Sequence, residues 1–156
     1  MDGITETPVE VLLAREESVA TKIEWLIDAS RTSIVAALYR LNSTRLGEAL
    51  RKAAERGVRI RLVLDRTKYE QTKATRQILD GGRLAFRLTD GRTGRKSKMH
   101  HKFALVDERL VLTGSYNWTD ESEDENYENL LILREPTAIE TYGAEFEKLW
   151  KEAAER

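Results

Sequence analysis

Short apolar runs alternate with segments of helical periodicity through the first half of the chain, and this alternation restricts the fold more than any other feature. The run TSIVAALY at Thr32–Tyr39 is continuous, as a buried central strand is, and VRIRLVLD at Val58–Asp65 is a second predicted strand. Residues 44–56 lie between them and place apolar side chains at helical spacing, with Ser43 or Thr44 as the N-cap. This alternation is typical of α/β domains.

The other segments extend this pattern and then change it. Further strands are expected at Val9–Ala14, Arg83–Leu88, His100–Asp107, Leu110–Thr113 and Asn129–Arg134, and further helices at Glu16–Ala29, at Thr67–Leu79 and from Pro136 to the end. The strands after residue 98 follow one another closely, which indicates a hairpin rather than more crossovers. No internal repeat or linker is visible. We therefore expect residues 1–156 to form a single α/β domain, with a mixed sheet flanked by helices.

The composition excludes several classes of site. The chain has no cysteine, which excludes disulfides and thiolate metal sites, and its two histidines argue against a histidine-rich zinc site. We expect neither a metal nor a cofactor. The formal net charge of −1 gives no overall preference for nucleic acid or membranes, so any such preference must be local. The N-terminal segment 1–17 lacks the pattern of a signal peptide. A cytoplasmic protein without stable membrane association is expected, or a periplasmic one if a signal has been removed.

The two histidines of the chain, His100 and His101, are adjacent to each other at the start of a predicted strand. Since side chains in a strand alternate between faces, His100 and Lys102 share one face about 7 Å apart, and His101 points to the other. Ser115 and Asn117 repeat this spacing of two residues after the next strand. An imidazole, an ammonium group, a hydroxyl and an amide together suit a tetrahedral anion such as phosphate, whose oxygens need several donors and fixed positive charge.

The spacing of these residues resembles a known family. The pattern His100-x-Lys102-x4-Asp107-x6-Gly114-Ser115-x-Asn117 resembles the complete HKD motif of the phospholipase D superfamily. Downstream, the sequence NYEN at residues 126–129 resembles the N-x-E-N segment of the same family. The order of strands and helices before the motif also fits the family. The resemblance implies a phospholipase D-like α/β sandwich.

The resemblance also implies a chemical role for each motif residue. The family cleaves phosphodiesters in two steps without a metal, and His100 matches the nucleophile that forms a phosphohistidine. Lys102, Ser115 and Asn117 match positions that bind the phosphate. Glu128 matches the glutamate that holds the other ring nitrogen of the nucleophilic histidine and fixes its tautomer.

The same chemistry needs a second histidine, which protonates the leaving oxygen and then activates water. Larger members of the family carry two copies of the motif, whereas this chain has one. His101 is unsuitable because it points away from the face of His100. We therefore expect a two-fold homodimer in which His100 of each copy contributes to a composite site.

The sequence around the motif adds three expectations. Asp107 falls on the face opposite His100 and is expected to be mainly structural. A basic run precedes the motif and is a candidate for contacts with the substrate backbone, through Arg92, Arg95, Lys96 and Lys98. The segment Asp120–Glu128 holds six acids in nine residues. Such a segment would repel a polyanion. It is either a solvated loop or a partner of the basic run, within the chain or across the dimer, that restricts access to the site.

Three functions are compatible with the motif. The first is cleavage of DNA or RNA, because the short single-motif members of the family that this chain resembles include bacterial endonucleases. The alternative is a phospholipid phosphodiesterase of the phospholipase D or cardiolipin hydrolase type. That activity needs an apolar membrane-facing surface or an anchor, and none is recognised in the sequence. The third is a non-catalytic nucleic-acid-binding module, against which the intact motif argues. We expect a metal-independent endonuclease.

Overall fold

A computed structural model describes residues 7–154 of the chain. The first six residues of the N-terminal segment 1–17 therefore lie outside the described part, as do residues 155–156. The described chain contains one seven-stranded mixed sheet with strand order β1-β7-β6-β5-β2-β3-β4. Its strands are β1 (Val9–Leu13), β2 (Ser33–Leu38), β3 (Arg59–Asp65), β4 (Ala85–Thr89), β5 (Lys102–Val106), β6 (Leu110–Gly114) and β7 (Asn129–Leu133). Strands β2, β3 and β4 are parallel, and the remaining pairs are antiparallel. The predicted mixed sheet is confirmed.

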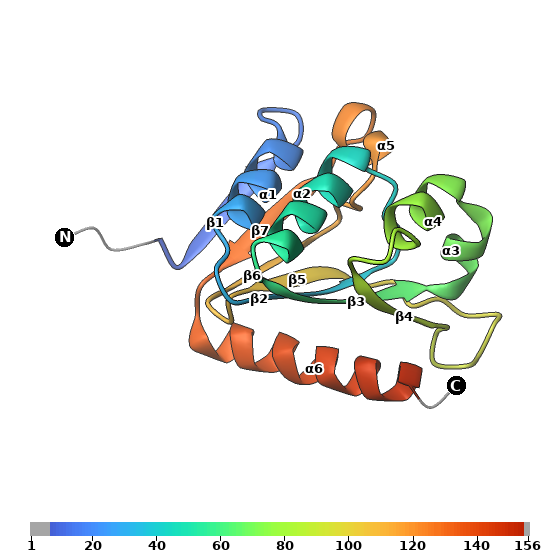
Figure 1. Cartoon of the computed structure of the whole chain (residues 1–156). Helices are drawn as coiled ribbons and strands as arrows, with labels where there is room; N and C mark the ends of the chain where they lie inside the picture. Colours follow the sequence, from blue (N-terminus) through green and yellow to red (C-terminus); the bar gives the residue numbers. More distant parts are fainter. Residues whose placement is uncertain (1–6, 155–156) are drawn as a thin grey trace.

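Helices cover both faces of the sheet (Figure 1). They are α1 (Val19–Asp28), α2 (Thr44–Glu55), α3 (Arg66–Gln71), α4 (Lys73–Leu79), α5 (Asp120–Asp124) and α6 (Pro136–Ala154). Helices α1 and α2 pack against each other on one face, and the long helix α6 crosses the other face below β2 to β6. A large apolar core fills the space between the sheet and helices α1 and α2. A smaller core around Phe103 and Phe146 lies between the sheet and α6. The predicted α/β sandwich is therefore confirmed.

The alternation of side chains along β5 assigns its residues to these two layers. Ala104 and Val106 belong to the core on the α1/α2 side, whereas Phe103 and Leu105 pack in the core between the sheet and α6. Lys102 shares the parity of Ala104 and therefore lies on the α1/α2 side of the sheet. The sequence-based assignment of faces in this strand is confirmed.

The structure differs from the sequence prediction in several local features. The helix predicted at 67–79 is two helices, because Thr72 is extended, with φ −121° and ψ 107°, and interrupts the turn between α3 and α4. The first helix begins at Val19 rather than Glu16, since the Ser18 side chain accepts a hydrogen bond from the N–H of Thr21 and caps it. The acidic segment contains a short helix, α5, capped by Thr119.

Candidate active site

The motif residues meet where the ends of three adjacent strands lie together, because these strands run antiparallel. The start of β5, the end of β6 and the start of β7 lie side by side there. Gly114 makes this approach possible: its φ is +146°, and a Cβ at this position would lie 2.4 Å from the backbone oxygen of Asn129. The strand order thus brings residues 115–117 next to Glu128.

His100 and Lys102 form the first contact of the site. The Nζ of Lys102 lies 3.2 Å from Nδ1 of His100 and donates a hydrogen bond to its backbone oxygen at 2.9 Å. The ring of Tyr39, which follows β2, lies 4.4 Å from the imidazole, centroid to centroid, and 5.4 Å from the ammonium group. The structure brings these two predicted residues together and adds Tyr39, which the sequence analysis missed.

Asp65 is a second residue that the sequence analysis missed. It is buried at the end of β3, where one carboxylate oxygen caps α3 by accepting from the N–H of Lys68. The other oxygen accepts a hydrogen bond of 3.0 Å from the N–H of Met99, the residue before His100. The signal was present in the sequence, because an aspartate between a buried strand and a helix is a typical N-cap. Asp65 therefore fixes the backbone that carries His100.

The surroundings of His100 favour its neutral form. Burial, the ammonium group of Lys102 and that of Lys98 lower the pKa of His100 below the ordinary histidine value. Burial also lowers the pKa of Lys102, which the nearby Glu128 partly offsets. A neutral imidazole beside a fixed positive charge is the arrangement that a histidine nucleophile needs for attack on a phosphate.

Glu128 does not make the contact that the resemblance implied. Its carboxylate accepts hydrogen bonds from the hydroxyl groups of Ser115 at 2.6 Å and Ser122 at 2.8 Å, and from the Asn126 amide at 3.2 Å. A contact with the imidazole of His100 is not found. The physical reason is competition: these nearer donors already occupy both carboxylate oxygens.

This arrangement has a consequence for the tautomer of His100. Because the ammonium group of Lys102 is a donor, Nδ1 accepts and the proton of the neutral ring lies on Nε2. That tautomer donates a hydrogen bond to a phosphate oxygen. Attack on phosphorus through Nε2 requires the proton to move to Nδ1.

Ser115 and Asn117 are held on the Glu128 side of the site. The Ser115 hydroxyl donates to Glu128 and accepts from the backbone N–H of Asn129 at 3.0 Å. The side-chain oxygen of Asn117 is buried and has no hydrogen-bond partner. A buried amide oxygen without a partner costs free energy and is typical of a site that is completed by a ligand or another chain.

The basic run divides into two parts. Arg92 and Lys98 line a cavity of about 910 Å³ together with His100, at the edge of the sheet next to α6. Arg95 points elsewhere, because its guanidinium forms two hydrogen bonds with Glu70 at 3.0 and 3.2 Å. Lys96 is exposed and does not line this cavity. Arg92 and Lys98 therefore share the cavity of His100, whereas Arg95 and Lys96 lie outside it.

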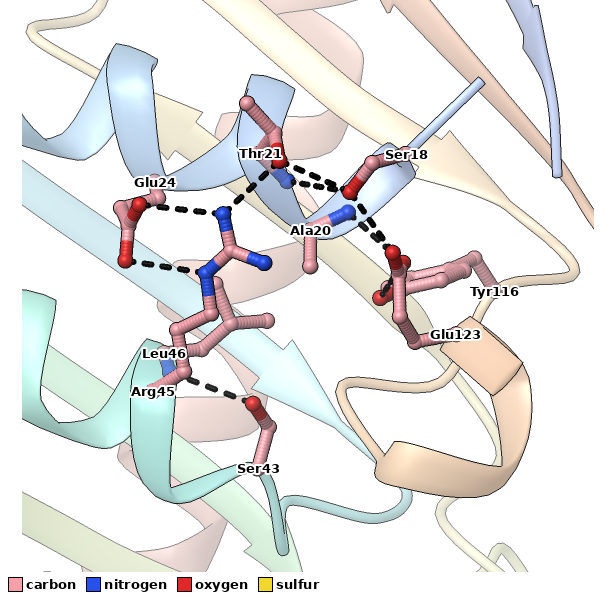
Figure 2. Close-up of polar contacts among 9 residues, drawn as sticks. All are labelled: Ser18, Ala20, Thr21, Glu24, Ser43, Arg45, Leu46, Tyr116 and Glu123. Atoms are coloured by element: carbon pink, nitrogen blue, oxygen red, sulfur yellow. Dashed lines mark hydrogen bonds and ion pairs between the residues drawn. The ribbon is translucent and has the colours of Figure 1, made fainter. Parts of the chain in front are cut away.

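The acidic segment does not pair with the basic run within the chain. Glu121 accepts hydrogen bonds from Arg40 and Asn42. Glu123 accepts hydrogen bonds from the start of α1 (Figure 2). The interpretation of the whole segment as a solvated loop therefore needs correction. Glu121 and Glu123 bind donors on other elements, whereas the remaining acids of α5 and Glu125 are exposed, and no pairing with the basic run is found among the described residues of one chain.

His101 points away from His100, as predicted. Its Nε2 lies 3.0 Å from a carboxylate oxygen of Glu145 on α6, and its ring makes an edge contact with Phe103. The histidine therefore joins the start of β5 to α6. Among residues 7–154, no cluster of three or more side chains is suited to bind a metal ion.

Asp107 lies at the opposite end of β5 and organises a turn there. Its carboxylate accepts hydrogen bonds from the backbone N–H groups of Arg31, Thr32 and Ser33, at 2.7 to 3.1 Å. Burial acts to raise the pKa of Asp107, but these hydrogen bonds outweigh it and hold the pKa below the ordinary aspartate value. This geometry supports the structural role expected for Asp107.

Asp107→Asn should lower stability while leaving activity largely intact. We expect a loss of about 1–2 kcal/mol at neutral pH, because an amide accepts through one oxygen only and turns its N–H₂ group toward backbone donors. The loss should shrink as the pH falls through the folded-state pKa, where the wild-type carboxylate is also protonated. Thermal unfolding at several pH values measures this, with the exposed Asp28→Asn as the control. An unchanged melting temperature with lost turnover would contradict the structural role.

Comparisons with known proteins agree with this geometry. Residues 23–150 match the family model described as "Cardiolipin synthase, PLD-like domain". The mitochondrial cardiolipin hydrolase of Homo sapiens is 32% identical over 144 residues, which cover 90% of this chain and 54% of that protein. The phospholipase D of Rickettsia conorii is 29% identical and is matched over 74% of this chain and 56% of that protein. The chain thus spans little more than half the length of these two relatives.

Solved structures show the same fold over nearly whole chains. Nuc from Salmonella typhimurium, a phospholipase D family member, superimposes with a TM-score of 0.80 at 27% identity, covering 92% of this chain and 93% of that one. NucT from Helicobacter pylori has a TM-score of 0.79 at 22% identity, covering 92% and 96%, and shows the fold alone. The match to the family model, the motif geometry and these structures together show that the chain belongs to the PLD-like domain family of the phospholipase D superfamily.

Proposed function

We propose that this protein is a metal-independent endonuclease that cleaves phosphodiester bonds through a phosphohistidine on His100. The contact of His100 with Lys102, beside the cavity that His100 shares with Arg92 and Lys98, is the observation that carries the proposal. Charged or titratable side chains make up most of its lining, from Asp90, Arg92, Lys98, His100, His101, Glu145 and Glu152. Arg92 and Lys98 in this lining can contact a phosphate backbone, whereas Asp90, Glu145 and Glu152 cannot.

The reaction follows from the residues at the sheet edge. The proton of the neutral His100 ring first moves from Nε2 to Nδ1. Nε2 then attacks phosphorus, a P–N bond forms, and the bond to the leaving oxygen breaks as a second histidine protonates that oxygen. Lys102 and Asn117 bind the phosphate oxygens, on which negative charge accumulates. A water molecule then attacks the phosphohistidine, so that the P–N bond breaks and the imidazole is regenerated. The products are a phosphate monoester and a free hydroxyl group.

One copy of the chain provides a single imidazole on the Lys102 face of β5, because His101 is turned toward Glu145 on α6. The leaving oxygen needs a proton, and the later water must lose one. We propose that His100 of a second copy performs both transfers in a two-fold dimer. Size-exclusion chromatography with light scattering tests this proposal, and an active monomer would contradict it.

Cleavage of nucleic acid in excess EDTA is the decisive experiment. Single- and double-stranded DNA and RNA should be offered in parallel to the pure wild-type protein. We expect cleavage that persists in EDTA, because no step of the proposed reaction uses a metal ion. Cleavage that stops in EDTA would contradict the metal-independent reaction. Failure to cleave any nucleic acid would overturn the proposed substrate.

A phospholipid phosphodiesterase is the second candidate, and two observations favour it. The curated relatives described above are named cardiolipin hydrolase and phospholipase D. In addition, Val9, Val11 and Leu13 are 39%, 57% and 47% exposed on the edge strand β1. None of the described helices has the length and apolar character needed to span a membrane. Vesicles containing cardiolipin, assayed beside the nucleic acids, distinguish the two substrates by release of phosphatidic acid.

A further inference from the structure

We propose that the acidic segment is a clamp that positions residues 115–117 for phosphate binding, with Ser122 and Glu123 as positioning residues that nothing in the HKD pattern assigns. The clamp consists of Ser122, Glu123 and Glu128. Its activity test rests on the proposed phosphodiesterase function, whereas its structural test does not. The inference explains why a segment rich in carboxylates lies beside a site that binds an anion.

Each residue of the 115–117 segment has its own anchor in the clamp. The hydroxyl of Ser115 donates to Glu128 at 2.6 Å, and the phenol of Tyr116 donates to Glu123 at 2.9 Å. The backbone N–H of Asn117 donates to the hydroxyl of Ser122 at 3.2 Å. That hydroxyl in turn donates to Glu128 at 2.8 Å, which links two of the three anchors. Residues that bind phosphate need such fixed positions to act in a transition state.

Glu123 is itself fixed by the N-terminus of α1 (Figure 2). Its carboxylate accepts from the hydroxyl of Ser18 at 2.6 Å and from the backbone N–H of Ala20 at 2.9 Å. The first turn of α1 contains no acidic residue of its own. Because the N-terminus of a helix carries partial positive charge, a carboxylate is stabilised there. Glu123 therefore connects α1 rigidly to the 115–117 segment.

Tyr116 depends on this carboxylate. The side chain is 1% exposed, and its hydroxyl has Glu123 as its acceptor. Burial, together with the hydrogen bond to Glu123, raises the pKa of Tyr116 far above the ordinary tyrosine value, so the hydroxyl remains a donor throughout the physiological range. Removal of the acceptor leaves a buried hydroxyl without a partner, which favours movement of Tyr116 and of its neighbours Ser115 and Asn117.

The clamp and simple electrostatics predict opposite results. If the acids only repelled an anionic substrate, any neutral replacement of Glu123 would improve binding. In the clamp, Glu123→Gln retains an acceptor oxygen for Tyr116 and Ala20, whereas Glu123→Ala removes it. Glu125 provides a matched control, because it is an exposed glutamate two positions later with no side-chain hydrogen bond found.

The test measures kcat and KM for bis(4-nitrophenyl) phosphate, with inhibition by vanadate, well below the melting temperature of each variant. We expect Glu123→Ala to lose about tenfold or more in kcat/KM and to bind vanadate correspondingly more weakly. Glu123→Gln should remain within about threefold of wild type, and Glu125→Ala should match or exceed it. Equal behaviour of the Ala and Gln variants, or wild-type kinetics in a destabilised Glu123→Ala, would overturn the clamp.

A second variant and an activity-free measurement keep the proposal testable if Glu123→Ala does not fold or if the wild type is inactive. Tyr116→Phe removes only the hydrogen bond to Glu123 and should lower kcat/KM in the same direction. Binding of inorganic phosphate, followed through the backbone amide NMR signals of Ser115 and Asn117, requires no turnover. Weaker phosphate binding in Tyr116→Phe supports the clamp even if no substrate is cleaved. Unchanged binding would contradict the clamp without bearing on the proposed function.

Discussion

His100→Ala should abolish phosphodiester cleavage, with kcat reduced on the order of 10⁴-fold or more. The proposed reaction forms its covalent intermediate on this imidazole, so no other side chain can replace it. In a two-fold dimer the substitution removes both the nucleophile and the proton donor at once. The melting temperature should change little, since the side chain is exposed and lies outside the strand ladder. Single-turnover assays on the substrate identified in EDTA measure the loss.

His101→Ala is the matched control for this prediction. The two histidines are adjacent, but His101 contacts Glu145 on α6 and faces away from the site. Its removal should reduce turnover by less than about tenfold, through the lost link between β5 and α6. Comparable losses in the two variants would contradict the assignment of His100 as the nucleophile. Trapping of a radiolabelled phosphoenzyme in wild type but not in His100→Ala would identify the intermediate directly.

Lys102→Met should reduce kcat on the order of 10²–10³-fold, the cost of removing one fixed charge from a transition state. The same change should alter the pH dependence. The ammonium group of Lys102 helps to lower the pKa of His100, so its loss should raise that pKa toward the ordinary histidine value. Because attack requires neutral His100, the acidic limb of the rate profile should move to higher pH. Rates measured between pH 4.5 and 8 test both effects.

Lys68→Met serves as the control for Lys102→Met. The ammonium group of Lys68 also lies near the ring of Tyr39, at 5.6 Å, but has no contact with His100. The Lys68→Met substitution should leave both the rate and the acidic limb of the pH–rate profile nearly unchanged. A shift of the limb in Lys68→Met as large as that in Lys102→Met would show that His100 responds to general surface charge rather than to its neighbour.

The sequence alone determined the fold class and the identity of the central residues. Alternation of apolar runs and amphipathic segments is a local property, and it predicted the α/β layers and most element boundaries correctly. The period of two residues in a strand placed His100 and Lys102 on one face and turned His101 to the other. The spacing of the motif identified the family. These inferences needed only short-range geometry, which the order of residues specifies.

The tertiary structure decided which side chains the site residues contact. The positions of Tyr39, Asp65 and Glu123 depend on how β2, β3 and α5 pack around β5 and β6, and no local pattern encodes those distances. Hydrogen bonds also compete: Glu128 binds Ser115 and Ser122 because their hydroxyl groups lie within reach, which the sequence could not rank against His100. From the sequence alone, the acidic residues of α5 were expected to repel an anionic substrate. In the fold, Glu121 and Glu123 face inward, because backbone and side-chain donors from distant segments converge on them.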